Sequence, residues 1–182
     1  MSILVYLLDT LFFCLISAAL LRAWLNAARI HMAQQPGPFL MALTDWVVKP
    51  LRRGLPPSWQ RSRWDTASLT AAVLLAFAHA LVWVLLTAHP VAAMGNAAYL
   101  WVLPVVAVKM LLRAALQGLL MLALGYAVLS WVQPQSPAYH WLGRLLGPLL
   151  QPIRRRLPLV GGVDLSALVF VLLLQVGLML VG

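Results

Sequence analysis

The sequence predicts an all-α membrane protein with four transmembrane helices, arranged as two parallel helical-hairpin repeats. The first observation is composition: 63% of residues are hydrophobic, only 9% are charged, and mean hydropathy is +0.92. Soluble domains are roughly 45–50% apolar and about 25% charged. The second is a set of apolar runs long enough to cross a bilayer. The third is a pattern of loop motifs in the first half that recurs in the second.

The four spans are predicted from apolar runs, since about 17–25 residues cross roughly 30 Å of hydrocarbon. They cover residues 3–25, 66–88, 105–131 and 165–181. Arg22 lies at the end of the first run, Arg29 follows it and no basic residue precedes it, which is the reverse of a signal peptide. We therefore expect this run to be retained as a helix. Asp65 and Asp164 directly precede the second and fourth spans, where a carboxylate caps the exposed amides of a helix.

Basic residues are concentrated in two predicted loops, residues 26–64 and 132–163. Residues 89–104, between the second and third spans, contain no Lys or Arg. Short loops rich in Lys and Arg remain in the cytoplasm. We therefore predict that both basic loops lie inside, and that both termini and the 89–104 connector lie outside.

Each basic loop also contains a short apolar stretch, Phe39–Leu51 in the first and Trp141–Ile153 in the second. Pro50 is expected to end the first stretch, and Pro148 and Pro152 are expected to break the second. Both stretches are too short to span, so we predict interfacial segments on the cytoplasmic side.

The two halves, residues 1–88 and 105–182, have the same order of motifs. The matching segments are Lys49–Pro56 with Gln151–Pro158, Asp65–Leu69 with Asp164–Leu168, and Arg22–Asn26 with Tyr126–Ser130. Each half contains two spans, so both halves have the same predicted orientation. Parallel repeats of this kind are related by an axis along the membrane normal.

This pattern resembles the YggT family of small bacterial membrane proteins, which has plastid relatives. Its most specific element is Pro-[Leu/Ile]-Arg-Arg-x-Leu-Pro followed by Asp at a span start, present twice. The first copy departs from the family form at Trp46, where the second copy has Pro148. The resemblance implies a bacterial cytoplasmic (inner) membrane location with periplasmic termini. It also implies a role in osmotic-stress tolerance or ion homeostasis, in cell division or nucleoid organisation, or in plastid haem attachment. It supplies no catalytic residue.

The basic clusters of the two loops are first of all topology signals. They are also predicted to bind anionic lipid, at roughly 1 kcal/mol per basic residue near the surface, or a partner protein. The residues concerned are Lys49, Arg52, Arg53, Arg154, Arg155 and Arg156. Nucleic acid is not an expected partner, because the clusters are short and phosphate attraction alone lacks specificity.

Polar residues inside the apolar runs form a second candidate site. Lys109, Arg113 and Gln117 are spaced by four residues, so they share one helix face and either snorkel toward headgroups or form a polar stripe inside the bundle. Asp9 corresponds to Arg113 in the repeat register, which predicts an ion pair between them, with separate solvation as the alternative. His79 is interpreted as a hydrogen-bonded helix-contact residue rather than a haem or metal ligand.

The sequence does not predict an enzyme, a cofactor or a metal site. It has four Asp, no Glu and a single cysteine, Cys14, within an apolar run. The leading hypothesis is a small accessory membrane protein that binds anionic lipid and either a membrane-protein partner or further copies of itself. The alternative is a small oligomeric transporter or channel for ions or small solutes, favoured by the parallel repeats and the intramembrane charges.

Overall fold

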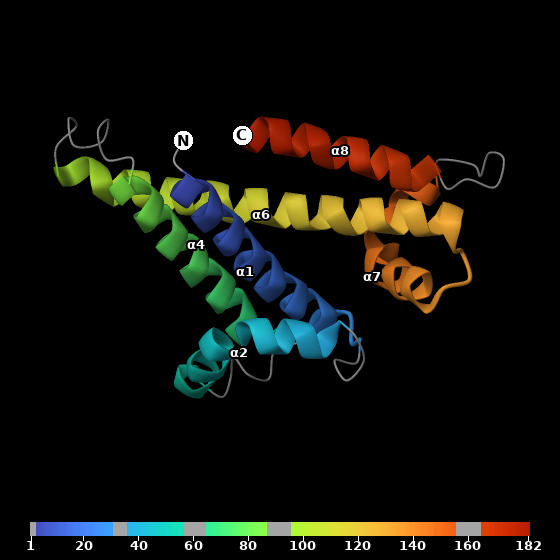
Figure 1. Ribbon diagram of the computed structural model, residues 1–182, viewed down its shortest axis with the longest axis horizontal. Helices are drawn as coiled ribbons and strands as arrows, with labels where there is room; N and C mark the ends of the chain where they lie inside the picture. The colour runs from blue at the N-terminus through green and yellow to red at the C-terminus, as the bar shows by residue number, and fades with distance from the viewer. Residues whose placement is uncertain (1–2, 31–35, 57–64, 87–95, 156–164) are drawn as a thin grey trace. The chain divides into compact units, whose positions relative to one another are not determined.

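The computed structural model describes residues 3–30, 36–56, 65–86, 96–155 and 165–182. Within these ranges the secondary structure is helical, as predicted (Figure 1). The helices are α1 (Ile3–Ala27), α2 (Gly37–Gly54), α4 (Thr66–Leu86), α6 (Asn96–Val132), α7 (Pro137–Arg154) and α8 (Leu165–Val181). Each half of the chain therefore has the order long apolar helix, 18-residue helix, apolar helix.

Among the described residues, three helices are long and apolar enough to cross a membrane: α1, α4 and the part of α6 from Trp101 to Val132. α8 is also apolar but has 17 residues, at the lower limit for a span. α6 begins at Asn96, so residues 96–104 of the expected connector are helical. Pro104 lies inside α6, since membrane helices tolerate a proline when neighbouring groups satisfy the freed carbonyl.

The chain divides into two compact units, residues 1–115 and 116–182. In the first unit α1 packs along α4, and α2 packs against both (Figure 1). Ile16 of α1 and Ala76 of α4 are almost fully buried in this contact, where small side chains let the helices approach closely. Val48 of α2 is fully buried against Ala67 and Ala71 of α4.

A backbone capping motif ends α1. Arg29 has a positive φ of 54°. The amide of Ile30 donates to the carbonyl of Leu25 at 3.0 Å, and the amide of Arg29 donates to that of Asn26 at 3.1 Å. This is the Schellman arrangement, which satisfies the last carbonyls of a helix. It ends α1 two residues beyond the expected limit and leaves Arg22 and Asn26 in its last turns.

The second unit has its core between the C-terminal part of α6, α7 and α8. Leu146 and Leu150 of α7 are fully buried, with Tyr126 of α6 and Phe170 of α8 in the same cluster. Ser136 caps α7 by accepting a hydrogen bond from the Tyr139 amide at 3.2 Å. The leucine face of α7 therefore packs on its own unit.

The prolines of α2 and α7 do not interrupt these helices, contrary to the expectation from sequence. Pro50 lies inside α2, and Pro148 and Pro152 lie inside α7. All three are exposed. A proline removes one helical hydrogen bond and frees the carbonyl four residues earlier. On an exposed face that carbonyl can be solvated, so both helices continue for 18 residues.

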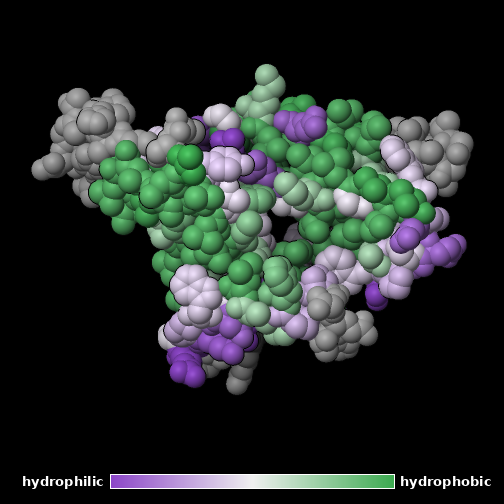
Figure 2. Space-filling view, viewed as in Figure 1, coloured by the Kyte–Doolittle hydropathy of each residue, from purple (hydrophilic) through white to green (hydrophobic). Residues whose placement is uncertain are grey.

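Large apolar side chains cover much of the outer surface of the helices, as expected where lipid is the solvent. On α4, Leu81 is 48% exposed and Leu85 is 66% exposed. Figure 2 shows this apolar surface, together with hydrophilic surface around the end of α2. The charges of the first unit are therefore concentrated where α2 meets the ends of the apolar helices.

Candidate functional site

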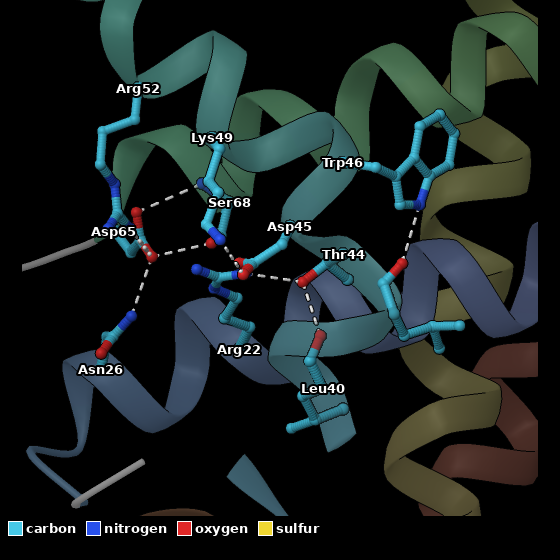
Figure 3. A network of polar contacts seen from close by, with 11 residues as sticks. Arg22, Asn26, Leu40, Thr44, Asp45, Trp46, Lys49, Arg52, Asp65 and Ser68 are labelled. Carbon is cyan, nitrogen blue, oxygen red and sulfur yellow. Dashed lines mark hydrogen bonds and ion pairs between the residues drawn. The ribbon is translucent and has the colours of Figure 1, made fainter. Parts of the chain in front are cut away.

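The candidate site is a network of charged and polar side chains where α1, α2 and α4 meet (Figure 3). α1 contributes Arg22 and Asn26, which are four residues apart and thus on one face of its last turns. We name this group the junction network. Its members are Arg22, Asn26, Thr44, Asp45, Lys49, Arg52, Asp65 and Ser68.

Arg22 is the buried centre of one half of the junction network. Its side chain is 6% exposed, and one terminal nitrogen, Nη1, donates to Asp45 Oδ1 and to Thr44 Oγ1, each at 2.8 Å. The Thr44 hydroxyl in turn donates a hydrogen bond to the Leu40 carbonyl at 2.7 Å. A buried cation is tolerated only when it is paired and hydrogen-bonded. The pairing thus fixes α2 against α1.

Asp45 holds two cations at once. Its second oxygen, Oδ2, lies 2.8 Å from Lys49 Nζ, one turn further along α2. The hydrogen bonds from Lys49 and from Arg22 hold the pKa of Asp45 below its ordinary value of 3.8. Lys49 remains 69% exposed, so this part of the network reaches the surface.

Asp65 organises the other half of the junction network. Its Oδ2 accepts from Ser68 Oγ at 2.7 Å, from Asn26 Nδ2 at 2.8 Å and from Arg52 Nη2 at 2.9 Å. Its Oδ1 accepts from the Ser68 amide at 3.3 Å, which is the geometry of a helix cap at the start of α4. One carboxylate therefore connects all three helices.

The side chain of Asp65 is only 8% exposed. Burial alone would raise the pKa of this carboxyl. The hydrogen bonds from Ser68 and the positive charge of Arg52 outweigh burial and hold the pKa below 3.8. Asp65 is therefore ionised at neutral pH and keeps Arg52 in place.

The second unit places a different group at the corresponding position. Tyr126, which aligns with Arg22, is buried and accepts from Arg154 Nη2 at 2.6 Å. Its hydroxyl also donates to that of Tyr139 at 3.1 Å, and the two rings stack with centroids 4.9 Å apart. Arg154, the counterpart of Arg52, thus binds a phenol where Arg52 binds a carboxylate.

The polar residues of the apolar helices have other partners than the predicted ion pair. Among the described residues, Asp9 Oδ1 lies 2.9 Å from His79 Nε2, and no contact of Asp9 with Arg113 is present. Arg113 and Lys109 are exposed on α6, and Gln117 is half-buried on the same helix. The repeat register aligns sequence positions but does not fix helix rotation. α1 packs along α4, which brings Asp9 to His79.

His79 is a buried helix-contact residue whose ring stacks on Phe12, with centroids 4.8 Å apart. Of the predicted loop residues, Arg52 lies in the junction network and Arg53 and Arg155 are exposed. Arg156 and Asp164 lie outside the described residues. In the described ranges no group of three or more His, Cys, Asp or Glu side chains comes together as a metal site.

Sequence reasoning missed Asp45, Thr44, Asn26 and Tyr139 as members of these contacts. The spacing of Asp45 and Lys49 was a usable signal, since residues four apart on a helix form ion pairs. By charge pattern alone, Arg22 is only a basic residue at the end of an apolar run. Its position inside α1 indicates a buried cation that needs an acidic partner, and Asp45 is one of only four acids in the chain.

Comparison with known proteins identifies the family. The model of the CCB3/YggT family matches residues 1–86 and 105–182. "Uncharacterized protein YggT" of Escherichia coli K12 is 34% identical over 180 residues, which is 97% of this chain and 87% of that protein. A Vibrio alginolyticus protein is 33% identical over 178 residues, covering 97% and 92% of the two chains. A Haemophilus influenzae protein is 31% identical over 156 residues, covering 85% and 78%. No solved structure matches. The two matched segments and these relatives show that the chain belongs to the CCB3/YggT family.

Proposed function

We propose that this protein is a non-enzymatic accessory protein of the bacterial cytoplasmic membrane, with four spans in two parallel hairpin repeats. Its basic loops lie on the cytoplasmic side and bind anionic lipid or a membrane-protein partner. α8 serves as the fourth span, since its 17 residues rise about 26 Å. The excess of Lys and Arg in the two loops supports the orientation, with both termini in the periplasm.

The junction network is the observation that carries this proposal. It joins the base of an apolar hairpin, α1 and α4, to an amphipathic helix whose last turn holds the exposed Arg53. A rigid base of this kind holds basic side chains at the level where lipid phosphates lie. Arg–phosphate contacts at that level are charge-assisted and bidentate.

Lipid binding is tested with the purified full chain in mild detergent. Native mass spectrometry counts bound phosphatidylglycerol against phosphatidylcholine at several salt concentrations. We expect a preference for phosphatidylglycerol that weakens with salt. The preference should disappear when Lys49, Arg52, Arg53, Arg154 and Arg155 are all changed to Gln. An equal count of both lipids in the unchanged chain would contradict the proposal.

Topology is tested by labelling single cysteines in a Cys14→Ala background, because Cys14 is exposed. An impermeant reagent added outside should label Asn96→Cys and should not label Ser58→Cys. Labelling of Ser58→Cys alone would show that the protein has the opposite orientation in the membrane. Labelling of both would mean that a predicted span does not cross.

The physiological part of the proposal is a role in envelope homeostasis under osmotic or ionic stress, or in assembly of a membrane complex. Growth of a deletion strain at high osmolarity should be restored by the wild-type chain and not by the variant with all five Gln changes. A small oligomeric transporter remains the alternative function. The contacts of Asp9 with His79 favour the accessory role, because these two polar groups satisfy one another.

A further inference from the structure

The two amphipathic helices differ in how their positive charge is neutralised. In the first unit, the carboxylate of Asp45 binds Arg22 and Lys49, and that of Asp65 binds Arg52. Of the basic residues of α2, only Arg53 has no partner among the described residues. Two of the three basic residues of this helix are therefore neutralised by a carboxylate, and one of them, Arg52, joins α2 to the start of α4.

α7 contains no acidic residue. Its exposed face holds His140, Arg144, Gln151 and Arg155, at spacings of four, seven and four residues. These spacings place the four side chains on one stripe of the helix. We name it the α7 stripe. The buried leucines of α7, Leu142, Leu145, Leu146 and Leu150, occupy the opposite face.

The α7 stripe has a fixed orientation within its unit. Leu146 and Leu150 are buried against α6 and α8. Near its C-terminal end, Arg154 donates to the Tyr126 hydroxyl of α6 at 2.6 Å. At its N-terminal end, Tyr139 stacks on the same Tyr126 ring. Both ends of α7 are thus anchored to α6, and the stripe points away from the leucine core.

We propose that the two repeats have divided roles: the α7 stripe binds the phosphate of an anionic phospholipid, while the cations of α2 act as a structural clamp. This inference rests on the proposed lipid binding and names the helix responsible. Guanidinium groups bind phosphate oxygens through paired hydrogen bonds. Arg144 and Arg155 are 11 residues apart, which places them about 16 Å apart along the helix. They therefore bind two separate headgroups rather than one.

A lipid is the occupant that fits this location. α7 follows directly on α6, whose last residues Trp131 and Val132 are 64% and 69% exposed. It also packs on α8, where Leu168 and Leu172 are 51% and 52% exposed. Apolar surface of this extent needs lipid around it, and the headgroups of those lipids lie at the ends of the helices.

The test compares two matched double variants, each of which removes two positive charges. Arg144→Gln with Arg155→Gln changes the α7 stripe, and Lys49→Gln with Arg52→Gln changes the clamp. Fluorescent phosphatidylglycerol is titrated against each purified protein, and melting temperature is measured by circular dichroism. For the stripe variant we expect about tenfold weaker lipid binding and an unchanged melting temperature. For the clamp variant we expect a lower melting temperature and a clearly smaller loss of lipid binding than in the stripe variant.

Three results would overturn the inference in distinguishable ways. Equal loss of lipid binding in both variants would show that the two helices share the site, leaving the proposed function intact. Full binding by the stripe variant, with loss only in the variant with all five Gln changes, would place the site elsewhere in the loops. Displacement of phosphatidylglycerol by a soluble poly-glutamate peptide at equal ionic strength would indicate an acidic protein segment as the natural occupant.

Discussion

Asp9 of α1 and His79 of α4 form a contact of 2.9 Å between two long, mainly apolar helices. The imidazole ring is also stacked on Phe12, with only 8° between the ring planes. Polar pairs between membrane helices contribute about 0.6 kcal/mol on average and up to about 1.7 kcal/mol. This pair therefore fixes the register of α1 on α4 more than it stabilises the unit.

A double-mutant cycle tests this contact. Asp9→Leu leaves His79 unpaired, and His79→Phe leaves Asp9 unpaired while keeping an aromatic ring on Phe12. Each single change should lower the melting temperature in detergent, and the double variant should lose less than the two combined, with a coupling of about 1 kcal/mol. Asp9→Leu combined with Arg113→Gln is the control and should be additive. Coupling in the control instead would restore the ion pair expected from the repeat register.

The two partners of the buried Arg22–Asp45 pair should differ in their sensitivity to substitution. Asp45→Asn leaves the Arg22 guanidinium, 6% exposed, without a counter-charge, and should destabilise the protein by about 3 kcal/mol. Arg22→Met removes the buried cation, and Asp45 keeps Lys49, so the loss should be smaller. Chemical denaturation in detergent measures both. Equal losses would mean that Arg22 is not desolvated as its burial indicates.

Acid should destabilise the first unit through Asp45 and Asp65. Both carboxyls have a folded-state pKa below 3.8, so the unfolded chain takes up protons first as pH falls. Their stabilisation is complete well above pH 3.8 and is lost as pH falls through the folded-state values. Melting temperature measured from about pH 7 down to about pH 3 should drop below about pH 4. The Asp65→Asn variant should have a lower melting temperature at about pH 7, and its melting temperature should fall less as pH is lowered. A pH profile identical to wild type would contradict the role of Asp65.

The correspondence between the two repeats can be tested at Tyr126, the residue of the second unit that aligns with Arg22. Tyr126→Arg places a cation where the first unit has Arg22, but Gly147 stands where the first unit has Asp45. The single change should lower stability by several kcal/mol, because a buried cation has no carboxylate. Adding Gly147→Asp should recover part of this loss, since a side chain at Gly147 meets nothing within 4 Å. Gly147→Ala is the control and should give no recovery.

The apolar helices were predictable because hydropathy alone indicates them. The run from residue 3 became Ile3–Ala27, and the run from residue 165 became Leu165–Val181. The amphipathic helices were located, although their prolines were expected to end or break them. Pro50 and Pro148 are exposed because they lie on the helix faces that do not pack inward. A sequence with few polar residues indicates only weakly which face of a helix packs inward.

The junction network was less predictable for a physical reason. Arg52 and Asp65 were recognised separately, one as a basic loop residue and the other as a helix cap, but nothing in their spacing joins them. Their contact arises because α2 folds back across the start of α4, which is a tertiary event. The same holds for Asp9, whose partner depends on the rotation of α1 about its own axis.

The length of α6 has a consequence for the surrounding bilayer. Its apolar part, Trp101–Val132, has 32 residues and is therefore about 48 Å long, well beyond the roughly 30 Å of hydrocarbon. Such a helix relieves the mismatch by tilting or by thickening the lipid around it, each at a fraction of a kcal/mol per Å. A membrane stretched by swelling becomes thinner and increases that mismatch. As a proposed span, α6 is therefore an element on which we expect membrane thickness, and with it membrane tension, to act.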